Sequence, residues 1–138
     1  MKIDGQCLCG YISYEANVDR DRVMICHCTD CQASSASAFR TGVMVRKDNF
    51  RLLTGQPKIF VKTAQSGAKR ALAFCPECGT SLYGSDVVEP KSYSLRIGTA
   101  RQRHQLVPKK QIWHYSALSW VAEIEQIEKF ELQPSVRA

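Results

Sequence analysis

The sequence lacks any long apolar run. No stretch approaches the roughly 20 apolar residues that a membrane-spanning helix needs, although 44% of the 138 residues are hydrophobic. Residues 1–6 lack the apolar segment of a secretory signal peptide, so we expect no export. Linkers, internal repeats and low-complexity segments are missing too. We therefore expect one domain over residues 1–138, long enough to bury its own core.

The sequence also lacks the features of a disulfide-bonded protein. Its seven cysteines are an odd number, and no export signal accompanies them. Disulfides persist in oxidising compartments, so this combination indicates a cytoplasmic protein whose thiols bind metal. A redox role for Cys75-x-x-Cys78 would require a βαβ pattern around it, which is absent.

The cysteines form three groups of short spacing. These groups are Cys7-x-Cys9, then Cys26-His27-Cys28-Thr29-Asp30-Cys31, then Cys75-Pro76-Glu77-Cys78. Closely spaced thiolates favour zinc, although an iron–sulfur cluster on the middle group stays open because sulfur also binds iron. The two outer pairs together supply four sulfurs, which is a complete tetrahedral set.

The middle group offers three sulfurs and no obvious fourth ligand. Structural zinc is closed by four protein ligands, whereas catalytic zinc keeps one position free. The residues that could close this site are His104, His114, Asp30 and Asp86. His27 is a poor ligand candidate, because on an extended backbone its side chain points away from those of its two cysteine neighbours. Both an open and a closed second site therefore remain possible.

The pattern of apolar residues and turns predicts a mainly β fold. Strands are expected at 11–16, 22–25, 40–46, 51–54, 58–63, 69–74, 81–84, 92–97, 111–115 and 123–132, the last of which also permits a short helix. Thr29-x-x-Gln32 matches a capping box, which predicts a helix with Thr29 as its N-cap. Cys31 would then be the second helical residue, where the helix dipole favours a thiolate.

The charge balance gives weak evidence about partners. The formal net charge is +6, but seven thiolates holding two zinc ions would lower it by three. One segment is basic and contains Arg101, Arg103, His104, Lys109 and Lys110. It lacks the interleaved aromatic residues of nucleic-acid binders, so we do not expect the protein to bind nucleic acid. The alternative to an enzyme is a zinc-stapled module that binds an anionic protein or nucleic acid.

The ordered motifs Cys-x-Cys-Gly, Cys-His-Cys-x-x-Cys and Cys-Pro-x-Cys-Gly resemble the glutathione-dependent formaldehyde-activating enzyme family, also called the centromere protein V/GFA family. The resemblance runs from Gly5 to about Trp120 and includes Trp113 and Ser119-Trp120 near its end. The stretch Ser34-Ser35-Ala36-Ser37 departs from it, since the family often has glycine there. The resemblance implies a single, mainly β, zinc-stapled coiled fold with short helices, similar to methionine sulfoxide reductase B and small zinc-bearing exchange chaperones.

The resemblance further implies two zinc ions per chain. Its structural zinc would be held by Cys7, Cys9, Cys75 and Cys78, and its catalytic zinc by Cys26, Cys28 and Cys31. The implied reaction joins glutathione to formaldehyde, giving S-hydroxymethylglutathione, and its reverse is a carbon–sulfur lyase step. Three thiolates weaken the Lewis acidity of zinc, so we favour delivery of the substrate as a thiolate over carbonyl polarisation. The basic residues considered as anchors for the glutathione carboxylates are Arg40, Lys69, Arg70, Arg96 and Arg101.

Overall fold

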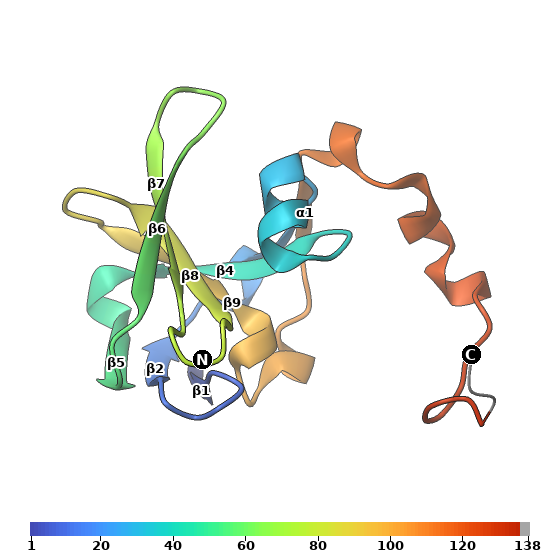
Figure 1. The fold of residues 1–138 in the computed structure, drawn as a ribbon, viewed down its shortest axis with the longest axis horizontal. Helices are drawn as coiled ribbons and strands as arrows, with labels where there is room; N and C mark the ends of the chain where they lie inside the picture. The colour runs from blue at the N-terminus through green and yellow to red at the C-terminus, as the bar shows by residue number, and fades with distance from the viewer. Residues whose placement is uncertain (136–138) are drawn as a thin grey trace.

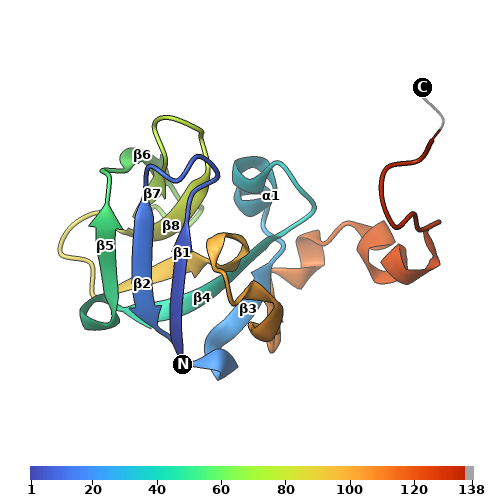
Figure 2. The same cartoon turned by 90° about the horizontal axis from the view of Figure 1, so that it is seen from below.

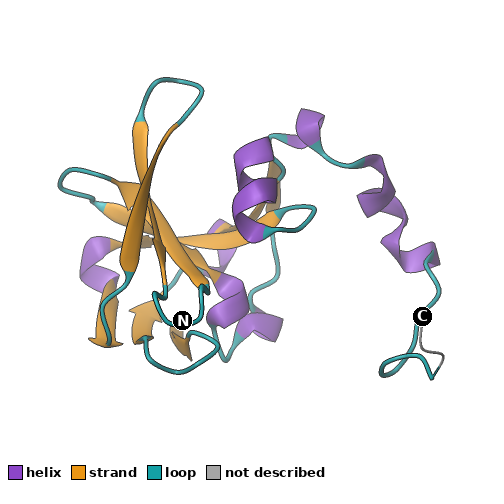
Figure 3. Cartoon of the chain, viewed as in Figure 1, coloured by secondary structure: helices purple, strands orange, loops and turns teal. Residues whose placement is uncertain are grey.

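The computed structural model describes residues 1–135, and most of its regular elements are strands (Figure 3). The strands are β1 (Lys2–Gln6), β2 (Ser13–Asn17), β3 (Val23–Cys26), β4 (Arg40–Arg46), β5 (Phe50–Thr54), β6 (Lys58–Thr63), β7 (Lys69–Phe74), β8 (Ser81–Asp86), β9 (Ser92–Arg96) and β10 (Lys110–Ile112). The helices are α1 (Thr29–Ser35) and the short 3-10 segments η1 (Arg20–Arg22), η2 (Lys47–Asn49), η3 (Ile97–Thr99), η4 (Arg103–Gln105), η5 (His114–Ser116) and η6 (Ser119–Gln126). The expected mainly β class is confirmed.

The strands form two sheets. The smaller sheet has the order β1-β2-β5, and Figure 2 shows these strands side by side. The larger sheet has the order β10-β3-β4-β9-β8-β7-β6. Its neighbours pair antiparallel, apart from β10 and β3, which are parallel. The β1–β2 loop and the β7–β8 loop each contain two cysteines, and α1 follows β3 (Figure 1).

The register of the larger sheet separates its two faces. Val43, Leu95 and Tyr83 align across β4, β9 and β8, and all three are buried. Successive residues of a strand point to opposite faces, so Gly42, Ser94 and Gly84 lie on the other face. One face therefore packs into the core, and the other is free to form a site.

The core lies between the two sheets. Both sheets supply buried apolar residues, including Ile3, Tyr14 and Ala16 from the smaller sheet and Val23, Val43, Val45, Ala73 and Leu95 from the larger one. The aromatic rings of Phe50, Tyr83 and Tyr93 pack against one another with centroids 5.1 to 5.3 Å apart. Burial of these side chains supplies the main force that holds the sheets together.

The sequence-based strand boundaries are confirmed at 40–46, 58–63 and 69–74. The strand β1 was not predicted, because its polar residues leave Ile3 as the one large apolar side chain. The predicted strand at 111–115 is shorter, since β10 ends at Ile112 and Trp113 adopts a left-handed backbone with φ of 55°. The predicted strand or helix at 123–132 is a 3-10 segment instead, which begins at Ser119 and ends at Gln126.

The C-terminal segment after η5 extends away from the body of the molecule (Figures 1 and 2). Its apolar side chains Trp120, Ile124, Ile127 and Phe130 are about half exposed. A strand is stable only when a neighbouring strand pairs with it, and no pairing involves residues 123–132. Within residues 1–135, no helix has both the length and the apolar character needed to cross a membrane.

The close approach of β1 to its neighbours generates a stability prediction. A Cβ atom on Gly5 would lie 2.4 Å from the carbonyl oxygen of Thr99 and 2.5 Å from the Tyr14 hydroxyl. Gly5→Ala should therefore lower the free energy of unfolding by about 1–3 kcal/mol, as overpacking does. Gly98→Ala is the matched control, because a Cβ there meets no atom within 4 Å. Urea unfolding of both variants tests this, and equal stabilities would contradict it.

Candidate metal centre

The first cysteine cluster joins two loops that are distant in sequence. Cys7 and Cys9 lie between β1 and β2, and Cys75 and Cys78 lie between β7 and β8. The loops are fastened together by a hydrogen bond from the Leu8 amide to the Thr80 hydroxyl, at 3.1 Å. Each loop turns at a trailing glycine in the left-handed region, with φ of 83° at Gly10 and 77° at Gly79.

The spacing of these sulfurs fits a tetrahedral metal ion. Zinc–sulfur bonds of about 2.3 Å in a tetrahedron place the sulfurs about 3.8 Å apart. The Sγ atoms of Cys7 and Cys9 are 3.7 Å apart, and those of Cys9 and Cys75 are 3.8 Å apart. All four Sγ atoms lie within 4.8 Å of one another. This cluster could therefore hold a metal ion without rearrangement.

Hydrogen bonds to sulfur prepare this cluster for metal. The Ile12 amide donates to Cys7 Sγ at 3.2 Å. A hydrogen bond with the Thr80 hydroxyl, at 3.1 Å, lowers the pKa of Cys78 to about 6. Metal ligation requires thiolates, and both hydrogen bonds stabilise the thiolate form.

The second cluster lies at the junction of β3 and α1. Cys26 ends β3, Cys28 is the N-cap of α1, and Cys31 is buried in its first turn. The Cys28 sulfur accepts from the Cys31 amide at 3.3 Å, and the Cys31 thiol donates to Cys26 Sγ at 3.3 Å. The three sulfurs lie within 4.8 Å of one another and could hold a metal ion.

The predicted capping box is wrong. The N-cap is Cys28, so Thr29 is the first helical residue and Cys31 the third. The sulfur of Cys28 reaches the free amide of Cys31, which leaves no role for a hydroxyl cap. The Gln32 amide turns instead to the carbonyl oxygens of His27 and Ser116, at 2.8 and 3.0 Å. The helix ends at Ala36, a left-handed cap with φ of 49°.

The thiols of this second cluster are unequal. The hydrogen bond from Cys31 lowers the pKa of Cys26 to about 5, and the same bond raises the pKa of Cys31. One thiolate is therefore already favoured before metal arrives. Binding a metal ion must displace the remaining protons, so the affinity of this cluster for metal falls in acid.

None of the four predicted closing ligands joins the second cluster within residues 1–135. Asp30 pairs with Lys62 at 2.7 Å, and Asp86 pairs with Arg70. The ring of His114 packs on that of His27, with centroids 5.5 Å apart. Within the described part of the chain, no ligand atom of a His, Asp or Glu lies within 4.8 Å of all three sulfurs.

His27 is fully buried and outside both clusters. Its Nε2 donates to the Gln111 side-chain oxygen at 2.7 Å, while Nδ1 is buried without a hydrogen-bond partner. The His27 amide also donates to the Ile112 carbonyl at 3.0 Å. His27 therefore connects β10 to the segment that carries the second cluster.

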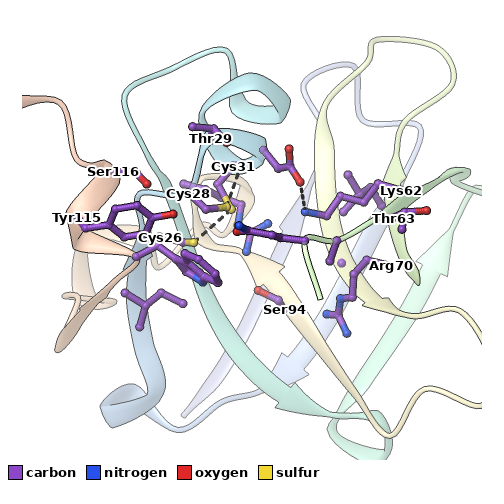
Figure 4. A pocket seen from close by; sticks show the side chains of 18 residues that line it. Cys26, Cys28, Thr29, Cys31, Lys62, Thr63, Arg70, Ser94, Tyr115 and Ser116 are labelled. Carbon is purple, nitrogen blue, oxygen red and sulfur yellow. Dashed lines mark hydrogen bonds and ion pairs between the residues drawn. The ribbon is translucent and has the colours of Figure 1, made fainter. Parts of the chain in front are cut away.

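The second cluster opens into a cavity of about 650 Å³. Figure 4 shows the cysteines on one side of this cavity and Lys62, Thr63 and Arg70 across from them. Trp113, Tyr115 and Ser116 line it from the C-terminal segment. A volume of this size suits a small-molecule ligand.

Of the basic residues that were considered as anchors for the glutathione carboxylates, some line the cavity and others lie outside it. Arg40 and Arg70 line the cavity. Lys69 is exposed and contacts the Thr63 hydroxyl instead, and Arg101 pairs with Asp4 at 2.9 Å, outside the cavity. Arg96 is 6% exposed and does not line this cavity. The basic segment around Arg103 and His104 does not line this cavity either.

Several cavity residues were missed from the sequence. Lys62, Thr63 and Gln65 come from the β6–β7 hairpin, and Tyr115 and Ser116 follow β10. Alternation along β6 does place Lys62 on one face, but only the order of strands in the sheet reveals that this face meets the cysteines. Among the cavity residues that follow β10 in the sequence, only Trp113 had a sequence signal, because it belongs to the predicted closing motif.

Fold and site together define a mainly β domain with two cysteine clusters that could each hold a metal ion. The family model of the glutathione-dependent formaldehyde-activating enzyme matches residues 2–116, and the chain belongs to this family. The family model ends at the point where the C-terminal segment leaves the body.

The chain is also similar to one curated protein and to one solved structure. An uncharacterized lyase of Schizosaccharomyces pombe is 29% identical over 80 residues, which cover 58% of this chain and 55% of the relative. The chain thus spans about half the length of that curated relative. The crystal structure of a Rhodobacter sphaeroides protein aligns with a TM-score of 0.60 and 16% identity, covering 78% of this chain and 98% of the other. That likeness shows the fold alone.

The four-cysteine cluster generates a folding prediction. Cys75→Ser should lower the free energy of unfolding by roughly several kcal/mol, because a lost ligand removes part of the metal-binding free energy. Cys28→Ser is the comparison, since the second cluster draws its ligands from one short segment and should leave most of the fold intact. Thermal melting and soluble yield of the two metal-loaded variants test this. An unchanged melting temperature for Cys75→Ser would show that this cluster does not stabilise the fold by joining the two loops.

Proposed function

We propose that this protein is a zinc-dependent carbon–sulfur lyase or synthase that joins a small thiol, glutathione, to an aldehyde such as formaldehyde. Cys26, Cys28 and Cys31 would hold the catalytic zinc, and Cys7, Cys9, Cys75 and Cys78 would hold the structural zinc. In this proposal the whole chain acts as one domain. The family match and the lyase relative support lyase-type chemistry.

The observation that carries the proposal is a three-sulfur cluster facing a cavity. Cys26, Cys28 and Cys31 line the cavity, and no His, Asp or Glu within residues 1–135 completes the cluster. The other cluster has a full set of four sulfurs. A site that serves only structure is normally closed by four protein ligands. The difference between the clusters therefore favours one structural and one catalytic ion.

A bound zinc ion would supply a position at which an incoming thiol is held as its nucleophilic thiolate at neutral pH. In the synthetic direction the S–H bond breaks and a carbon–sulfur bond forms at the aldehyde carbon. The electron pair of the C=O bond moves to oxygen, which takes up one proton, so the reaction is balanced without oxidant or reductant. The reverse step breaks the carbon–sulfur bond and restores both substrates.

The remaining walls of the cavity suit glutathione, which carries two carboxylates. Arg40 lines the cavity, and its side chain makes no ion pair or hydrogen bond within residues 1–135. Lys62 and Arg70 are held by Asp30 and Asp86, which fixes their position at the cavity wall. We assign Arg40 as the main anchor for a carboxylate, because its charge is free to be paired.

Cobalt substitution tests the proposed thiol site. Two cobalt ions should bind, and glutathione at millimolar concentration should change the visible bands of one ion by entering its coordination shell. Cys31→Ser should abolish both this change and the activity, whereas the bands of the four-cysteine ion should stay constant. Unchanged spectra in the wild type would indicate a closed second site and favour a zinc-stapled binding module.

Substitution of Arg40 tests the proposed anchor. Arg40→Met should raise KM for glutathione about tenfold, because hydrogen bonds to charged groups contribute about 1.5–3 kcal/mol. The formaldehyde dependence should change little. Arg51→Met is the control, since Arg51 is exposed, pairs with Glu15 at 2.6 Å and lies outside the cavity. Equal KM values for the two variants would remove Arg40 from the binding site.

A further inference from the structure

Arg96 is a buried charge without an acidic partner. Its side chain is 6% exposed, and its Nη1 donates to the carbonyl oxygen and the hydroxyl of Ser94, at 2.9 and 3.2 Å. Its Nε is buried and has no hydrogen-bond partner. None of the ion pairs formed by residues 1–135 includes it. A buried guanidinium in this state is costly, so a negative group is expected nearby.

The strand register places Arg96 beneath the cavity. Arg96 of β9 aligns with Gly42 of β4, and Gly42 aligns with Met24 of β3, two residues before Cys26. Arg96 and Cys26 therefore lie on the same face of the sheet. The Nη2 atom lies over Gly84, where an added Cβ would come within 3.1 Å of it. Gly84 and Ser94 form the cavity floor above this guanidinium.

Asp30, which lines the cavity, and Asp86, which contacts the lining residue Arg70, are each already paired with a basic side chain. Asp30 is paired with Lys62, and Asp86 with Arg70. Burial first, and then the nearby Arg40, lower the pKa of Arg96 to about 9, while the sulfurs of Cys31 and Cys26 act in the opposite direction. The three thiols that line the cavity are therefore the groups that remain to supply negative charge opposite Arg96 when a metal ion is bound.

A loaded metal centre would supply the missing counter-charge. Three thiolates around a divalent ion leave one net negative charge, and a bound substrate thiolate would add a second. Because the surroundings are buried, the attraction between this centre and a guanidinium is screened much less than at the surface. The charge of Arg96 thus matches the charge that the centre acquires when it is assembled.

We propose that Arg96 is a positioning residue of the three-cysteine centre, a buried counter-charge that stabilises the anionic metal–thiolate complex. It acts through the cysteines and does not touch the substrate. The inference rests on the proposed function only for the identity of the incoming thiolate. The counter-charge itself requires only that Cys26, Cys28 and Cys31 bind a divalent ion.

Cobalt affinity, measured by competition with a chelator, tests this role without any measurement of activity. Arg96→Gln keeps a hydrogen-bond donor near Ser94 but removes the positive charge. Arg96→Lys keeps the positive charge but removes the planar guanidinium group. The Gln variant should lose roughly 10–100-fold in affinity at the three-cysteine site, as expected for a lost partner of metal ligands. The Lys variant should bind cobalt more tightly than the Gln variant. The four-cysteine site serves as an internal control, and Arg101→Gln as a control for an exposed arginine.

Two results would overturn the inference. The first is that Arg96→Gln binds cobalt at the three-cysteine site as tightly as the wild type. The second is that Arg96→Lys binds cobalt at this site no more tightly than Arg96→Gln. The wild type gives an independent test, because attraction to a buried charge should change little between about 0.05 and about 0.5 M sodium perchlorate. A steep loss of affinity with salt would assign the effect to the exposed cavity cations instead.

The outcomes also separate this inference from the proposed function. If glutathione leaves the visible cobalt bands unchanged, glutathione is not the substrate, but the role of Arg96 as a counter-charge is unaffected. A wild-type protein that binds a single cobalt ion, at the four-cysteine site, would overturn both.

Discussion

The four-cysteine cluster joins loops from the two sheets, and the metal ion proposed there is the constraint on which we expect the rest of the structure to depend. Cys7 and Cys9 belong to the loop that leaves the smaller sheet, and Cys75 and Cys78 to a hairpin loop of the larger one. A structural zinc ion contributes about 10 kcal/mol or more to folding, which is comparable with the roughly 5–15 kcal/mol of net stability of a typical domain. A zinc ion at this position would fix the sheets at this end. The core between them sets the orientation of the opposite face of the larger sheet, and the second cluster lies on that face.

The division of the larger sheet into an apolar and a charged face explains the character of the site. Val43 and Leu95 pack into the core, while their neighbours Gly42, Ser94 and Arg96 lie on the side of the cysteines. A cavity with several basic side chains raises the local concentration of anions. In the proposed function, the same positive charge would also offset the negative charge that three thiolates bring to a divalent ion. Substrate attraction and stability of the metal centre would then depend on the same electrostatic field.

The sequence predicted the parts of this protein that depend on local patterns. The sulfurs of the seven cysteines do gather in the expected groups of four and three, and their roles as metal ligands stay a prediction. The spacing along the chain already separates Cys26, Cys28 and Cys31 from the outer pairs. Strands with clear turns at both ends, such as β6 and β7, were found with their boundaries. The predictions that were wrong concern features that depend on tertiary context. Cys28, and not Thr29, is the N-cap of α1, and the apolar residues after Trp120 do not pair with any strand. The contribution of Lys62 to the cavity required knowledge of strand order.

The position of the two clusters along the chain has a consequence for biosynthesis. Five of the seven thiols, at positions 7, 9, 26, 28 and 31, precede Cys75 and Cys78 in the sequence and are therefore translated first. The three-cysteine group is local, whereas Cys7 and Cys9 meet their two partner sulfurs only after the β7–β8 hairpin has been made. If both clusters bind metal as proposed, the four-cysteine site is therefore completed later in synthesis than the three-cysteine site.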